Sequence, residues 1–165
     1  MRFKTITDQA LLVLFAIILI FNACKDDDVD NTPPVISIIE PADDEHLSIG
    51  SDIHFECDFS DDVELHSYKI EIHDNFDGHN HEKSVHMVKE EEVPFSYSNS
   101  WTFDEGLENS LIHHHEIVIP DSIDGVPVAH GAYHFGIYCT DVAGNESHVF
   151  IDVILGEGDG EHHHE

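Results

Sequence analysis

Apolar and polar positions divide the chain into an apolar leader and a series of short alternating segments. Positions 10–21 are all apolar. After position 33, apolar residues mostly alternate with polar ones, which is the period of a half-buried β-strand, and no window there has a helical period. The segments that the pattern predicts as strands are 35–39, 53–59, 68–72, 95–103, 117–119, 133–139 and 149–155.

About seven short strands separated by turn residues are typical of an immunoglobulin-like sandwich. The sequence therefore predicts an all-β fold, an immunoglobulin-like β-sandwich of antiparallel strands over residues 33–155. Cys57 and Cys139 take inward positions of the second and sixth strands, which carry the inter-sheet disulfide in immunoglobulin domains. We expect a Cys57–Cys139 disulfide, with two buried free thiols as the alternative.

The leader has the features of an export signal. Arg2 and Lys4 precede the apolar run, which is too short to cross about 30 Å of hydrocarbon as a helix. It ends at Ala23-Cys24, which resembles the lipobox of bacterial lipoproteins. We predict that residues 1–23 are a signal peptide and that Cys24 is lipidated. An uncleaved signal anchor is the alternative.

The residues after Cys24 indicate where the anchor is placed. Lys25 is followed by Asp26–Asp28, which resembles the signal that sends Bacteroidetes-type lipoproteins to the outer face of the outer membrane. We therefore expect a lipid-anchored outer-membrane protein that faces the cell exterior, with residues 24–32 as an acidic tether. The tether could equally be a solvated linker. Residues 156–165 are low in complexity and predict a disordered, acidic and His-rich tail.

The net charge of the chain limits which partners it can bind. The chain has 35 Asp and Glu against 6 Lys and Arg, for a formal net charge of −29. Such a field repels nucleic acid and anionic lipid headgroups and attracts cations. We therefore expect no nucleic-acid partner, and we expect contact with the membrane only through the lipid on Cys24.

Histidine is the unusual component, with 16 residues in the chain. Neutral imidazole is a good ligand for zinc, copper and nickel. In an immunoglobulin-like sandwich the third and sixth strands are antiparallel neighbours, so the end of the third lies beside the start of the sixth. This predicts a metal site at one rim of the sandwich. Its expected ligands are His73, His79, His81 and His134, with Asp77 as an oxygen ligand or acceptor.

The other histidines fall into two groups. His113, His114 and His115 are a second set of candidate ligands, whose position relative to the rim the sequence leaves open. His46, His54, His66 and His148 are expected to be ordinary surface residues. The Asp-rich segments allow calcium, but Asp74–Glu82 lacks the spacing of a helix–loop–helix calcium site. No nucleophile elbow, phosphate loop or zinc-protease motif is present, so no enzyme is predicted.

Three strings together resemble the Bacteroidetes lipoproteins grouped as domain of unknown function 4625. They are 72–81 (IHDNFDGHNH), 113–120 (HHHEIVIP) and 131–146 (GAYHFGIYCTDVAGNE). The resemblance implies a lipid-anchored, sandwich-like domain and no activity.

The histidines predict the function. We expect capture, buffering or hand-over of a divalent transition metal, zinc first and copper or nickel as alternatives, with an outer-membrane transporter as the recipient. The rival hypothesis is an adhesion or accessory module that binds protein or glycan, with incidental or pH-sensing histidines.

Overall fold

The computed structural model describes residues 29–76 and 92–157. The chain divides into two compact units, residues 1–30 and 31–165, and every strand lies in the second. The described residues contain no helix, and hence none that could span a membrane. The strands are β1 (Val35–Glu40), β2 (Glu45–Ser48), β3 (Asp52–Ser60), β4 (Leu65–Asp74), β5 (Tyr97–Thr102), β6 (Asn109–Val118), β7 (Ser122–Ile123), β8 (Val126–Pro127), β9 (Gly131–Asp141) and β10 (Glu146–Gly156).

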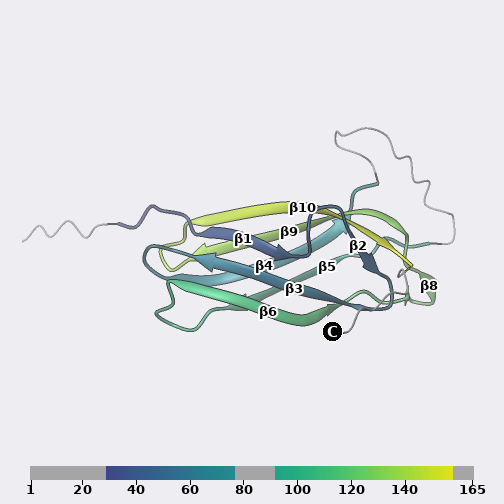
Figure 1. Ribbon diagram of the computed structural model, residues 1–165, viewed down its shortest axis with the longest axis horizontal. Coiled ribbons are helices and arrows are strands. Elements are labelled where there is room, and N and C mark those ends of the chain that lie inside the picture. Colours follow the sequence, from purple (N-terminus) through teal and green to yellow (C-terminus); the bar gives the residue numbers. More distant parts are fainter. Residues whose placement is uncertain (1–28, 77–91, 158–165) are drawn as a thin grey trace, which may run out of the picture. The chain divides into compact units, whose positions relative to one another are not determined.

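Two sheets form the sandwich. The first has the order β1-β3-β6 and is antiparallel throughout. The second has the order β2-β10-β9-β4-β5 and is antiparallel except for the parallel pair β2–β10. Figure 1 shows the long strands of both sheets running lengthwise through the sandwich, and β7 and β8 form a small separate hairpin. The predicted all-β, immunoglobulin-like sandwich is confirmed.

The core lies between the two sheets and is built by the period-2 alternation. On β3, Phe55, Cys57 and Phe59 are fully buried and face inward, while Glu56 and Asp58, which alternate with them, face outward. Phe135 on β9 meets Phe55 from the other sheet, with ring centroids 6.2 Å apart. Burying each such side chain contributes roughly 1.5–3 kcal/mol to folding. The alternation therefore fixes which side chains remain on the outer faces.

Cys57 on β3 and Cys139 on β9 face the core, as their positions predicted, and both are fully buried. They are free thiols in the structure, so the disulfide itself remains a prediction. Burial raises the pKa of each thiol to about 12. Both are therefore protonated and unreactive while the domain is folded.

The largest departure from the predicted strands is at β6, which covers Asn109–Val118 rather than 117–119. An inward-facing histidine, His114, and a register shift beside it break the alternation on which the prediction relied. Strands β2, β7 and β8 were not predicted either. They have two to four residues each, too few for a period to be recognised.

Candidate metal-binding site

A β-bulge sets the positions of the histidines on β6. The pairing of β3 with β6 shifts register between Ile53 and Phe55. His54 therefore lies opposite two residues of β6, His115 and Glu116, instead of one. The extra residue leaves both His115 and Glu116 exposed, and the strand returns to the core at the next residue, Ile117. Without the bulge, the histidines of β6 and the buried end of the strand could not both keep their present faces.

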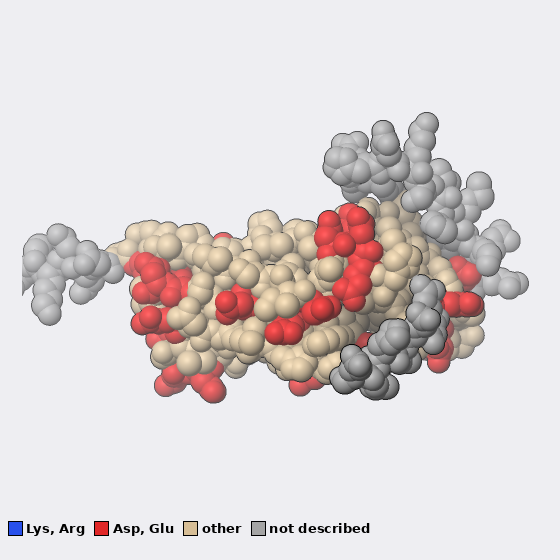
Figure 2. All heavy atoms as spheres, viewed as in Figure 1, with Lys and Arg blue, Asp and Glu red and all other residues tan. Residues whose placement is uncertain are grey.

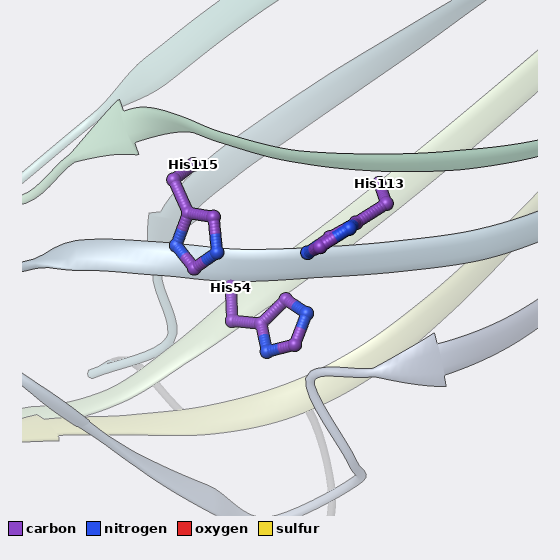
Figure 3. Close-up of side chains that lie close together, drawn as sticks. All are labelled: His54, His113 and His115. Atoms are coloured by element: carbon purple, nitrogen blue, oxygen red, sulfur yellow. The ribbon is translucent and has the colours of Figure 1, made fainter. Parts of the chain in front are cut away.

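His54, His113 and His115 gather on the outer face of the β1-β3-β6 sheet. His113 and His115 are two positions apart on β6, so they point to the same side, and His54 joins them from β3. The ring of His54 has its centroid 4.7 Å from that of His113 and 4.8 Å from that of His115. All three side chains are exposed, and Figure 3 shows their rings lying close together.

The spacing of the three rings suits a small metal ion. One nitrogen from each of His54, His113 and His115 lies within 4.8 Å of the chosen nitrogens of the other two. A tetrahedral zinc ion with bonds of 2.0–2.1 Å holds its nitrogens about 3.3 Å apart. The rings must therefore approach one another by up to about 1.5 Å, a movement that rotation of exposed side chains allows. No Cys, Asp or Glu among the described residues joins these three within the same distance.

Asp52 orients one of these rings. Its Oδ2 lies 2.6 Å from Nδ1 of His115. An ionised carboxylate can only accept a hydrogen bond, so Nδ1 of His115 carries the hydrogen, and in the neutral ring Nε2 is the nitrogen that offers a lone pair. A hydrogen bond to the backbone and the contact with His115 lower the pKa of Asp52, which keeps the carboxylate ionised. This carboxylate–imidazole pair is typical of histidines that ligate metals.

His114 points the other way, into the sandwich. Its ring lies 5.0 Å from those of Phe55 and Trp101, centroid to centroid. Burial lowers the pKa of His114, and its Nε2 is shielded from solvent without a hydrogen-bond partner. Of the three consecutive histidines considered as second candidates, the outer two can hold an ion on the sheet face, and His114 cannot join them.

The predicted rim site is only partly within the described residues. His73 on β4 and His134 on β9 lie directly opposite one another, as the antiparallel pairing predicted, with ring centroids 5.3 Å apart. Oδ1 of Asp152 lies 2.7 Å from Nδ1 of His134. The remaining expected ligands, Asp77, His79 and His81, lie outside the described residues.

The two groups of histidines do not combine. His73 and His134 belong to the five-stranded sheet, whereas His113 and His115 belong to the three-stranded one. Each group faces outward from its own sheet, with the core between them. Within the described residues, His113–His115 therefore do not join His73 and His134, the part of the rim that the structure places.

The sequence analysis placed His54 among ordinary surface residues, and the structure shows it exposed and close to His113 and His115. The signal that could have found it was topological. In an immunoglobulin-like sandwich the second strand pairs with the strand that carries His113 and His115. An outward histidine on the second strand could therefore be expected to face that pair. The register that decides it depends on the bulge, which the sequence did not reveal.

The surroundings are strongly acidic. Lys69 is the sole Lys or Arg within residues 29–76 and 92–157, and it is paired with Glu71, with Nζ 3.0 Å from Oε1. Figure 2 shows Asp and Glu, and no Lys or Arg, among the described residues on the face viewed. The field at the triad is therefore negative, which favours the approach of a cation.

The sequence model of the family described as domain of unknown function, DUF4625, matches residues 22–155. The chain belongs to this family. The matched region of this DUF4625 protein includes Cys24, the triad and the His73/His134 pair. A search of curated proteins finds no match.

Proposed function

We propose that this DUF4625 protein is a surface-anchored lipoprotein that binds a divalent transition metal, zinc first, for capture, buffering or hand-over. The observation that carries the proposal is the triad of His54, His113 and His115, whose nitrogens converge to within 4.8 Å. His115 is oriented by Asp52 at 2.6 Å. Three imidazoles from two strands, one of them held by a carboxylate, are more than an exposed His-rich surface requires.

The donor atoms select the class of metal. Imidazole nitrogen suits zinc, divalent copper and nickel, whereas calcium and magnesium require oxygen ligands. Monovalent copper prefers thiolate and thioether sulfur, and the triad offers neither. Zinc is the first choice because it accepts the angles that the side chains provide, and copper and nickel are the alternatives.

The predicted cellular location and the net charge support the same proposal. Ala23-Cys24 after an apolar leader, and Asp26–Asp28 behind it, support an anchor at the outer membrane. A protein of net charge −29 concentrates cations around itself at low salt. A protein at the outer membrane could receive zinc there and deliver it to an outer-membrane transporter.

The experiment is calorimetric titration of the mature protein, purified in detergent, with zinc chloride. We expect His113→Ala/His115→Ala to lose one equivalent of bound zinc. The matched control, His66→Ala/His148→Ala, removes two outward histidines that lie away from the triad, and it should keep that equivalent. Equal stoichiometry in the two double variants would contradict the proposal, whatever zinc the other histidines hold.

A second function, glycan binding by an accessory module, is favoured by one patch on the outer face of the five-stranded sheet. Phe150 is 46% exposed although it lies within β10. It lies over Gly136, where a Cβ atom would come within 2.5 Å of its ring. Tyr138 stands perpendicular to Phe150 with centroids 5.6 Å apart, and Nζ of Lys69 lies 4.0 Å from the centre of the Tyr138 ring.

Tyr138 also lines a polar cavity of about 230 Å³. Its lining includes Lys69, Ser100, Thr140 and Glu146. Exposed aromatic faces beside such donors and acceptors suit a neutral sugar ring. Binding of neutral oligosaccharides that is lost in Phe150→Ala, and is unaffected by a zinc chelator, would favour this function over metal binding.

A further inference from the structure

The triad supplies three donors, whereas zinc in proteins is almost always bound by four. Within the described residues, no carboxylate or thiol joins the three histidines at the same distance. Two carboxylates of β3 beside the triad take other positions. Asp52 is engaged with Nδ1 of His115, and Glu56 faces His113 across the strand pair. An ion held by the triad therefore keeps one position for a further ligand.

The direction of that position follows from the strands. His54, His113 and His115 rise from the same face of β3 and β6, so their nitrogens approach the ion from the sheet side. Tetrahedral geometry then directs the fourth position away from the sheet. All three side chains are exposed, and β6 is an edge strand of its sheet. A ligand from outside can thus reach the ion from above the sheet and from beyond β6.

The surrounding charge selects the kind of ligand. Thiolate, carboxylate and phosphate groups are anions, and they must approach through the field of a chain with net charge −29. A neutral imidazole is not repelled, and it is a good donor to zinc, copper and nickel. A histidine side chain of another protein satisfies both conditions.

We infer that the metal bound by His54, His113 and His115 carries an exchangeable water, and that an imidazole from outside the chain replaces it. This inference rests on the proposed function. The exchange is a ligand substitution: the bond from the metal to water breaks, the bond to the imidazole nitrogen forms, and water leaves. No charge or electron is transferred. The site can thereby hold a metal ion jointly with a histidine of a recipient, which is the geometry that hand-over needs.

The test uses Co²⁺, whose visible absorption bands report its coordination. The mature protein in detergent receives one equivalent of cobalt chloride and is then titrated with free imidazole. We expect a saturable shift of the cobalt bands while dialysis shows that the cobalt stays bound. Azide or phosphate should need roughly tenfold or higher concentrations for an equal shift. His113→Ala/His115→Ala should lose the shift, and His66→Ala/His148→Ala should keep it.

The outcomes separate this inference from the proposed function. Absence of triad-dependent cobalt binding refutes both. Triad-dependent binding with bands that imidazole leaves unchanged refutes the open position alone, since a donor of the chain itself then fills it. Glu56→Gln identifies one such donor. If this variant alters the bands of the cobalt protein or first makes them sensitive to imidazole, Glu56 is the fourth ligand and the inference is wrong.

Discussion

Asp52 provides a sharp prediction, because it contacts His115 without belonging to the triad. Asp52→Ala removes the acceptor that keeps the hydrogen on Nδ1 of His115, so the ring is free to turn and to change tautomer. Loss of such a supporting carboxylate lowers metal affinity by roughly 10–100-fold. The side chains of Asp52 and His115 are about half exposed, at 51% and 52%, and solvent screens the contact. We therefore expect the lower end, about tenfold or 1.4 kcal/mol of binding free energy.

The assay is competition for zinc against a chromogenic chelator, with Asp58→Ala as the matched control. Asp58 faces outward on the same strand and carries the same charge, but it lies about 13 Å from His54 along β3. Its loss should weaken binding much less than the loss of Asp52. Equal effects of the two substitutions would mean that Asp52 acts only through the general field, and the assigned role in orienting His115 would be wrong.

Three further predictions concern other parts of the molecule. His114→Phe should leave zinc affinity unchanged and stabilise the metal-free domain, since it removes a buried Nε2 without a partner, an atom whose burial costs about 1–3 kcal/mol. Burial lowers the pKa of folded His114 below its usual 6.5, so the unfolded chain binds the proton more readily and stability falls as pH drops below about 6.5. Melting curves from pH 7.5 to 5 should show that His114→Phe reduces this loss, and identical pH profiles would contradict it. If the Cys57–Cys139 disulfide forms in the cell, alkylation of the denatured protein without reductant should spare both cysteines. In the reduced, folded protein both thiols should also resist alkylation, because they are buried. Finally, Cys24→Ser should release the protein from membrane fractions, and unchanged sedimentation with membranes would contradict the anchor.

The sequence predicted the fold because the fold depends on a repeated signal. Alternation along 53–59 and 133–139 assigned the inward faces of two central strands, and both assignments are confirmed by burial of Phe55 and Phe135. The same alternation, together with the antiparallel pairing, predicted that His73 and His134 are neighbours. Where a fixed period relates each residue of a strand to the next, the sequence is enough to predict which side chains lie together in the structure.

The triad could not be predicted in the same way, because it depends on a single irregularity. The bulge opposite His54 shifts the register by one residue, and a shift of one residue exchanges the two faces of a strand. A run of three histidines gives no indication of which members face outward. His113 and His115 are selected by the bulge and by the packing of His114 against Phe55 and Trp101, both of which arise from tertiary structure.

The measurement that tests the central claim most directly is a crystal structure of the zinc-loaded protein, with data collected on both sides of the zinc absorption edge. The proposal predicts an anomalous peak between His54, His113 and His115, at 2.0–2.1 Å from one nitrogen of each ring, with Nε2 as the donor of His115. A peak that occurs only elsewhere, for example between His73 and His134, would contradict the triad as the metal site. Zinc-loaded crystals with no ordered zinc at any histidine would contradict the proposed metal-binding function itself.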